Sequence, residues 1–179
     1  MHILCTCVYH VKLQSMNPQV SPLEEQIGAM LRRRGMKLAT AESCTGGLLA
    51  SRLTDVPGSS DYFLGGIVAY AYEAKVALLD VSWNTLQAYG AVSSETVLEM
   101  AAGARKALNA DLAISISGIA GPGGGMPNKP VGTTWFGLVA GVGQWSYLRQ
   151  FNGDRLQNKS QASEAALQLL IEYLQGAAK

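Results

Sequence analysis

The chain has 179 residues, a length that fits one domain with a sizeable core. Its 14 Lys and Arg residues nearly balance 13 Asp and Glu residues, and only 15% of the chain is charged, which argues against nucleic acid or a membrane surface as a partner. The three cysteines predict neither a disulfide framework nor a zinc site, and no apolar run approaches the roughly 20 residues of a membrane span. We therefore expect a cytoplasmic protein that acts on a small molecule.

Helical and strand patterns alternate along the chain. Residues 1–20 have no periodicity and are predicted to be a poorly ordered extension with a natural start at Met16, whereas residues 21–179 are predicted to form a single domain. The first helix is expected to use Ser21 as its N-cap and to end at Gly35. Further helices are predicted at 46–55, 73–79, 84–89, 94–108 and 155–174, and strands at 37–41, 62–71, 111–117, 132–140 and 145–151.

This order of elements predicts a layered α/β domain. The last two strands are joined at residues 141–143, most simply as a hairpin, so they are expected to pair antiparallel. The earlier strands are separated by helices and are expected to be parallel. The sheet is therefore predicted to be mixed.

Residues 41–47, Ala-Glu-Ser-Cys-Thr-Gly-Gly, lie where a strand should give way to a helix. They include three nucleophilic side chains, Ser43, Cys44 and Thr45, next to a pair of glycines. Unpaired N–H groups at the start of a helix favour an oxyanion or a phosphate there. The alternative is that Ser or Thr in this stretch is an ordinary N-cap.

The expected topology brings two other residues to this turn. In a right-handed βαβ unit the carboxyl ends of both strands lie at the same edge of the sheet, which is where open α/β sheets bind ligands. Ser43 follows the first strand, and Tyr70 and Lys75 follow the second. If the strand at 111–117 is also parallel, the glycine-rich loop 118–125 reaches the same edge.

A serine nucleophile needs a base, and histidine cannot supply it here. The only histidines, His2 and His10, lie in the amino-terminal extension. Lysine can serve if burial and nearby positive potential lower its pKa, so Lys75 is the candidate base. Tyr70 is expected to relay the proton or orient the lysine.

These residue types point to acyl transfer, most simply the hydrolysis of an amide or ester. The backbone N–H groups of Thr45, Gly46 and Gly47 are the candidate donors to the oxyanion that forms during the reaction. Cys44 and Thr45 remain alternative nucleophiles, and each also has a structural interpretation, Cys44 as a small buried side chain and Thr45 as a helix cap.

The glycine-rich loop 118–125 matches neither a P-loop nor a dinucleotide-binding fingerprint, which disfavours a nucleoside triphosphatase. Its glycines suit either close approach to a ligand or a flexible turn. Arg155 follows an expected Asp154 cap, where it either clamps a phosphate or carboxylate or is solvated.

Seven motifs in order resemble the CinA carboxy-terminal domain family over roughly residues 22–175. They are Ala-Glu-Ser-Cys-Thr-Gly-Gly at 41–47, Pro-Gly-Ser-Ser at 57–60, Tyr70 with Glu-Ala-Lys at 73–75, Gly-Ala-Val-Ser at 90–93, Ser-Gly-Ile-Ala-Gly-Pro-Gly-Gly at 117–124, Lys-Pro-Val-Gly-Thr at 129–133 and Gly-Asp-Arg at 153–155.

The resemblance implies a three-layer α/β/α sandwich with a mixed, mostly parallel sheet. It implies hydrolytic deamidation of nicotinamide mononucleotide to nicotinate mononucleotide and ammonia, a step of pyridine nucleotide recycling, with no cofactor and no metal. Ser43 would be the nucleophile, Lys75 its base and Tyr70 a supporting residue. The implied substrate-binding residues are Gly118, Ala120, Gly121, Thr133 and Arg155.

Two positions depart from the family pattern: Tyr72 stands where Asn is frequent, and Lys159 where Arg is common. The amino-terminal molybdopterin-binding-like domain of full CinA proteins, with its pyrophosphatase activity, is expected to be absent. The sequence is compatible with a homo-oligomer. The alternative function is a non-catalytic, competence- or DNA-damage-associated protein that binds a nucleotide.

Overall fold

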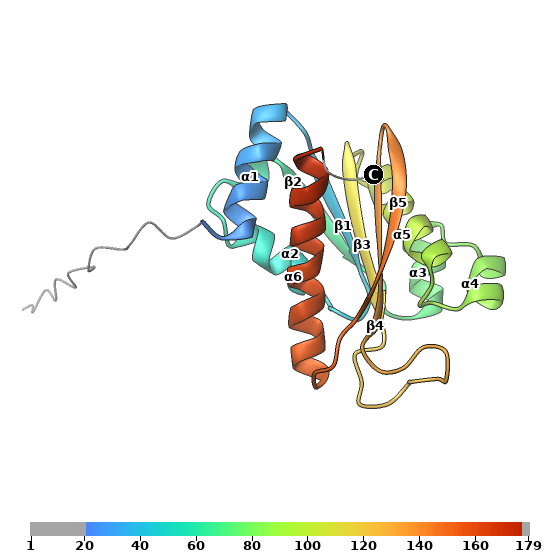
Figure 1. The fold of residues 1–179 in the computed structure, drawn as a ribbon. Coiled ribbons are helices and arrows are strands. Elements are labelled where there is room, and N and C mark those ends of the chain that lie inside the picture. The colour runs from blue at the N-terminus through green and yellow to red at the C-terminus, as the bar shows by residue number, and fades with distance from the viewer. Residues whose placement is uncertain (1–20, 177–179) are drawn as a thin grey trace, which may run out of the picture.

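A five-stranded mixed sheet forms the centre of the protein. The computed structural model describes residues 21–176, so the predictions for the amino-terminal extension lie outside the described residues. The strands are β1 (Leu38–Glu42), β2 (Phe63–Val68), β3 (Leu112–Gly118), β4 (Thr133–Ala140) and β5 (Gly143–Gln150), in the spatial order β2-β1-β3-β4-β5 (Figure 1).

The pairing confirms the predicted mixed sheet. β1 pairs in parallel with both β2 and β3, whereas β4 is antiparallel to β3 and to β5. Four strands therefore run in one direction and β4 runs against them. The carboxyl ends of β1, β2 and β3 consequently meet at one edge of the sheet.

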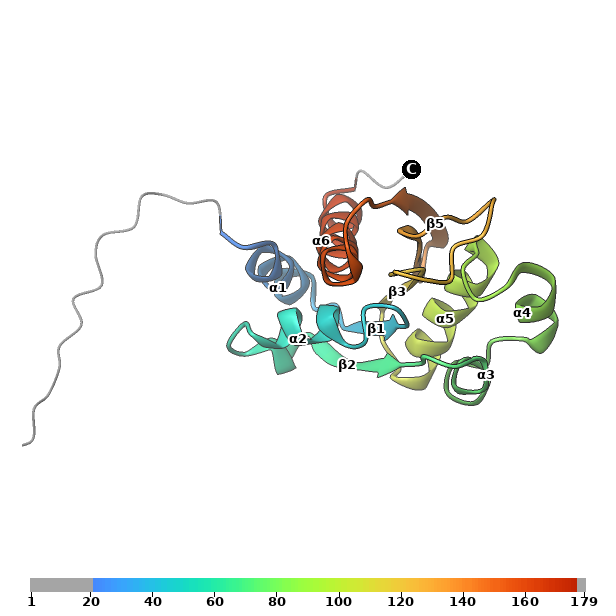
Figure 2. The same cartoon turned by 90° about the horizontal axis from the view of Figure 1, so that it is seen from below.

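Helices cover both faces of this sheet, as expected for a three-layer α/β/α sandwich (Figure 2). One core cluster joins the sheet to α1 (Leu23–Arg34), α2 (Leu48–Thr54) and α6 (Arg155–Leu174). A second joins the opposite face to α3 (Tyr72–Leu79), α4 (Trp83–Tyr89) and α5 (Ser94–Ala107). Alternate residues of β1 and β3 point to opposite faces: Leu38 and Ile114 belong to the first cluster, Ala39 and Ala113 to the second.

Helices α1 to α4 all begin at positions that differ from the sequence prediction, α3 and α4 by one residue each. The N-cap of α1 is Pro22, whereas the sequence predicts Ser21. Ser21 contacts the helix through its carbonyl oxygen, which accepts a hydrogen bond from the Gln26 side chain. Helix α2 begins at Leu48, because Gly46 and Gly47 adopt positive φ angles of 66° and 95° that end the turn before the helix can start.

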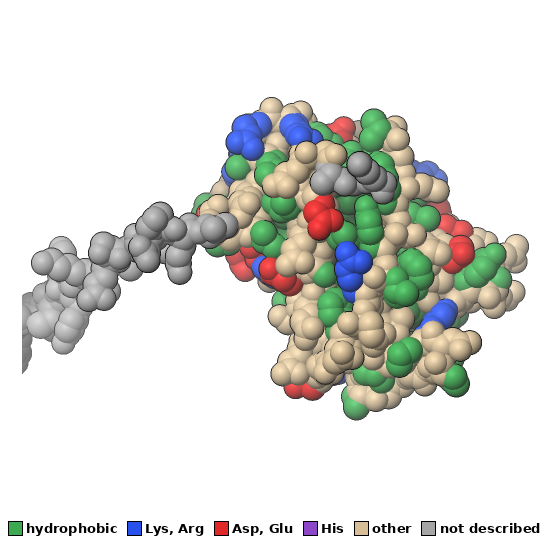
Figure 3. All heavy atoms as spheres, viewed as in Figure 1, with side chains coloured by type: hydrophobic (Ala, Val, Ile, Leu, Met, Phe, Trp, Pro, Cys, Tyr) green, Lys and Arg blue, Asp and Glu red, His purple; other side chains and the backbone are tan. Residues whose placement is uncertain are grey.

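No helix within residues 21–176 is both long and apolar enough to cross a membrane. On the face seen in Figure 3, Lys and Arg side chains lie apart from one another among Asp, Glu and apolar side chains. This agrees with the nearly balanced charge of the chain.

Gly103 is where helices α3 and α5 come into close contact. A Cβ at position 103 would overlap the carbonyl group of Leu79, which cannot rotate away. We expect Gly103→Ala to lower the free energy of unfolding by about 2 kcal/mol, measured by urea denaturation. Gly123→Ala is the matched control, because a Cβ there meets no atom within 4 Å and the stability should be unchanged. Equal stabilities for the two variants would contradict this close contact.

Candidate active site

Ser43 lies at the carboxyl end of β1 with its main chain held on both sides. Its N–H donates to the carbonyl of Ile116 on β3 at 2.9 Å, and its own carbonyl accepts from the N–H of Gly46 at 3.1 Å. Only 7% of the residue is exposed. The side chain therefore leaves a fixed turn at the sheet edge where ligands bind in α/β folds.

Lys75, in the first turn of α3, contacts Ser43 directly. Its Nζ donates to Ser43 Oγ at 2.9 Å and to the carbonyl oxygens of Ala69 at 2.8 Å and Tyr70 at 3.1 Å. The residue is fully buried, and this burial lowers the pKa of Lys75 from 10.5 to about 8. The predicted meeting of Ser43 and Lys75 is thus present, and the amine is buried as a lysine base requires.

Tyr70 contacts Lys75 through its carbonyl oxygen, whereas its side chain points to Arg155. The Tyr70 hydroxyl accepts a hydrogen bond from Arg155 Nη2 at 3.0 Å, and the side chain is largely exposed. Arg155 Nη1 donates to the carbonyl of Gly121 at 2.8 Å. Arg155 therefore ties the loop after β2 to the glycine-rich loop after β3.

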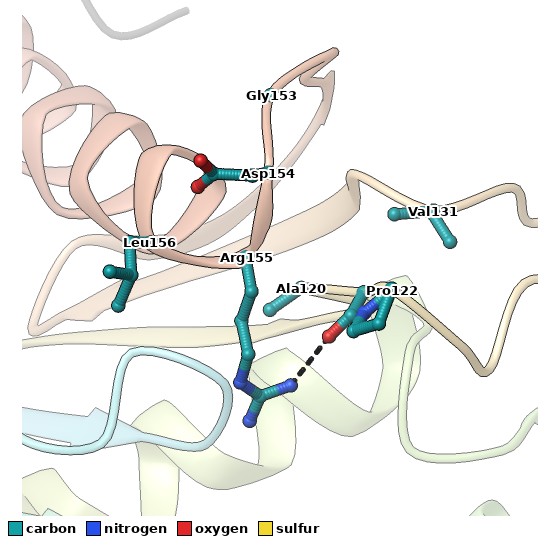
Figure 4. A pocket seen from close by; sticks show the side chains of 8 residues that line it. Ala120, Pro122, Val131, Gly153, Asp154, Arg155 and Leu156 are labelled. Carbon is teal, nitrogen blue, oxygen red and sulfur yellow. Dashed lines mark hydrogen bonds between the residues drawn. The ribbon is translucent and has the colours of Figure 1, made fainter.

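A cavity of about 330 Å³ opens beside Arg155 (Figure 4). Its lining is mostly apolar, with the charged groups of Arg155 and Asp154 at the start of α6. Within residues 21–176 no carboxylate forms a salt bridge with Arg155. The other lining residues are Ala120, Gly121, Pro122, Val131, Gly153 and Leu156.

The other predicted binding residues have structural contacts of their own. At Gly118 a Cβ would lie 2.5 Å from Thr134 Oγ1, so glycine allows β3 to pack against β4. The carbonyl of Ala120 accepts from the Asn158 side chain at 3.1 Å. The Thr133 hydroxyl donates hydrogen bonds to the Pro130 carbonyl and to the Gln150 side chain, and it has no hydrogen bond to Ser43 or Lys75.

The three predicted oxyanion donors differ in availability. The N–H of Gly46 donates to the Ser43 carbonyl, and the N–H of Gly47 donates to Glu42 Oε2 at 3.0 Å. The N–H groups of Thr45 and its neighbour Cys44 donate to no oxygen atom within the described residues, and both lie close enough to the Cys44 sulfur to act against the rise of its pKa. Among the described residues, the N–H of Leu48, the first residue of α2, also has no acceptor, so free donors lie both next to Ser43 and at the start of the helix.

Glu42 is the residue of this site that the sequence prediction missed. Its side chain is buried and accepts hydrogen bonds from the backbone at the start of α2. An acidic residue shortly before a helix is a recognisable signal, since a carboxylate is favourable at a helix N-terminus.

Cys44 and Thr45 are both buried beside Ser43. Burial raises the pKa of the Cys44 thiol to about 11, which keeps it protonated at neutral pH and disfavours it as a nucleophile. Thr45 Oγ1 has no hydrogen-bond partner among the described residues.

The two residues that depart from the family pattern have different surroundings. The Tyr72 hydroxyl accepts from the N–H of Ala91 at 3.2 Å, and its ring packs against Trp83 with centroids 6.4 Å apart. Lys159 Nζ would lie 3.8 Å from a Cβ at Gly46, which places its charge over the Ser43 turn. Within residues 21–176 no cluster of three His, Cys, Asp or Glu residues is suited to hold a metal ion.

Sequence and structure are both similar to known proteins. The chain is 54% identical over 157 residues to a CinA-like protein of Chloroherpeton thalassium, covering 86% of this chain and 37% of that protein. It is 49% identical over 153 residues to the nicotinamide-nucleotide amidohydrolase PncC of Escherichia coli, covering 85% of this chain and 93% of that protein. A crystal structure of a competence-damaged protein (CinA) superfamily protein from Klebsiella pneumoniae matches with a TM-score of 0.83 and 38% identity, over 86% of this chain and 96% of that one. Residues 20–174 match the CinA C-terminal domain, and the chain belongs to that family.

Proposed function

We propose that this protein is an amidase that hydrolyses nicotinamide mononucleotide to nicotinate mononucleotide and ammonia. The observation that carries the proposal is the buried contact between Lys75 Nζ and Ser43 Oγ. The name and the 49% identity of the Escherichia coli relative, which this chain covers almost entirely, support the substrate.

The contacts of Lys75 suit a base. A neutral amine has two N–H groups and one lone pair, and the carbonyls of Ala69 and Tyr70 accept two hydrogen bonds from Nζ. With both N–H groups used in this way, the lone pair faces Ser43 Oγ. The two carbonyls thereby orient the amine to take the hydroxyl proton.

The reaction then follows in two stages. Ser43 Oγ attacks the carboxamide carbon as its proton passes to Lys75, and the N–H groups of Thr45 and Cys44 stabilise the oxyanion. The Lys75 ammonium returns the proton to the amide nitrogen, the C–N bond breaks and ammonia leaves. Lys75 next takes a proton from the water that attacks the acyl-enzyme and returns it to Ser43 Oγ as the ester bond breaks. The released acid loses its own proton to solvent and leaves as the carboxylate.

Of the remaining predicted residues, Ala120, Gly121 and Arg155 line the cavity proposed to bind the substrate. Gly118 and Thr133 act on the same loop from outside the cavity, because Gly118 lets β3 pack against β4 and Thr133 holds the start of β4 against β5. Arg155 offers the substrate phosphate a charge that no carboxylate of residues 21–176 pairs with. Gly46 and Gly47 supply the positive φ angles of the turn.

Arg155→Ala should raise KM for nicotinamide mononucleotide about tenfold, with a smaller change in kcat, because charge-assisted bonds to a phosphate contribute mainly to binding. Arg149→Ala removes an exposed arginine of β5 outside this cavity and serves as the control. Steady-state kinetics measure both. An unchanged KM in the Arg155 variant would exclude this residue from substrate binding.

The alternative is a nucleotide-binding protein without activity, associated with competence or DNA damage. Relatives of this chain are named competence-damage inducible or competence-damaged proteins. Ammonia release from nicotinamide mononucleotide by the purified, folded protein separates the two. Turnover above background supports the amidase. Binding of the nucleotide without ammonia release would support the alternative.

A further inference from the structure

Glu42 closes the turn that carries Ser43. Its Oε2 accepts from the N–H groups of Gly47 at 3.0 Å and Leu49 at 3.1 Å, and its Oε1 accepts from Ala50 at 2.8 Å. Only 1% of the residue is exposed. A carboxylate at the end of β1 thus binds the start of α2, across the turn that contains the nucleophile.

In the part of the chain that the structure describes, no other side chain caps α2. Its N-cap residue is Gly47, which has no side chain to accept a hydrogen bond. Glu42 therefore satisfies N–H groups that would otherwise have no acceptor in the helix. These contacts occupy the N–H groups of Gly47, Leu49 and Ala50, so a substrate anion can use those three donors only if Glu42 is displaced.

The position of Ser43 depends on the same turn. The residue is attached to β3 through its N–H and to Gly46 through its carbonyl, and Gly46 and Gly47 both have positive φ angles. A turn containing two glycines is conformationally free, so contacts at its ends must select one shape. Glu42 supplies three such contacts at the far end.

We propose that Glu42 is a positioning residue for the nucleophile: its carboxylate holds the 43–47 turn in the shape that keeps Ser43 Oγ beside Lys75 Nζ. This inference rests on the proposed role of Ser43. Glu42 has no hydrogen bond to Lys75 or to Ser43 Oγ, so it acts through the main chain of the turn.

Glu42→Gln tests this proposal, because it keeps the size of the side chain but leaves one acceptor oxygen where there were two. We expect kcat for ammonia release to fall about 10²-fold, with KM changed less than about twofold, as for a small displacement of a reacting group. Ser82→Ala is the control, because it removes the side-chain cap of α4, a helix of the same length as α2. That variant should keep the kcat of the unmodified protein.

A second measurement tests the reactivity of the Ser43 hydroxyl in the absence of the substrate. The rate at which an alkyl fluorophosphonate modifies Ser43, followed by mass spectrometry, should fall in Glu42→Gln and stay unchanged in Ser82→Ala. If the unmodified protein reacts with the probe but releases no ammonia, the proposed substrate is wrong and the modification rate still decides the role of Glu42. A protein that is neither modified nor active overturns both proposals.

The role of Glu42 is overturned if Glu42→Gln matches the unmodified protein in kcat and modification rate, or if KM rises as much as kcat falls. Circular dichroism establishes that each variant is folded at the assay temperature. Should Glu42→Gln not fold, Glu42→Asp takes its place, because it keeps both oxygens and the charge but withdraws them by one methylene group. The same fall in kcat is then expected.

Discussion

Ser43→Ala is expected to lower kcat for ammonia release by roughly 10⁴-fold or more, because no other group replaces the covalent step. Binding of nicotinamide mononucleotide should persist, since the hydroxyl contacts Lys75 and not the cavity beside Arg155. Steady-state kinetics and calorimetric titration measure the two effects separately.

Cys44→Ala is the matched control for this experiment, because it changes the neighbouring nucleophilic side chain. The Cys44 thiol is buried and burial raises its pKa to about 11, so its removal should leave kcat within a few fold. Activity that survives in Ser43→Ala and disappears in Cys44→Ala would reassign the nucleophile. Activity that survives in both would point to Thr45.

The contact between Ser43 and Lys75 could be predicted because it follows from topology. Hydrophobic periodicity located β1 and β2, and the fixed hand of the crossover placed their carboxyl ends at one edge of the sheet. Ser43 and Lys75 both follow those ends closely, and the structure has them 2.9 Å apart. The absence of histidine outside residues 1–20 then left lysine as the candidate base.

The direction of individual side chains could not be predicted in this way. Tyr70 also follows β2, yet its hydroxyl contacts Arg155, a residue 85 positions later in the chain. Which backbone N–H groups are free to bind an oxyanion also depends on a side-chain contact, because the N–H of Gly47 donates to the side chain of Glu42. A pattern of residue types shows which groups reach an edge, whereas rotamers and long-range partners decide which atoms meet there.

Lys75→Met is expected to remove the base while keeping most of the volume of a buried side chain. In the unmodified protein the pKa of Lys75 is lowered to about 8, so kcat/KM should fall about tenfold per pH unit below pH 8 as the amine becomes protonated. Lys75→Met should lose most of its activity and also this dependence on pH. Lys106→Met, which removes an exposed lysine paired with Asp80, should keep the normal profile.

The same lysine should leave a signature in stability that does not depend on catalysis. Its pKa is about 8 in the folded protein and about 10.5 when unfolded, so between these values the unfolded chain binds the additional proton. The contribution of Lys75 to the free energy of unfolding therefore rises with pH from about 8 to about 10.5, and below pH 8 it is constant. Urea denaturation at pH 7 and pH 9.5 should show this rise in the unmodified protein and in Lys106→Met, but a smaller one in Lys75→Met. The same rise in all three proteins would mean that Lys75 has an ordinary pKa, and a base that is fully protonated at neutral pH could not accept the proton of Ser43.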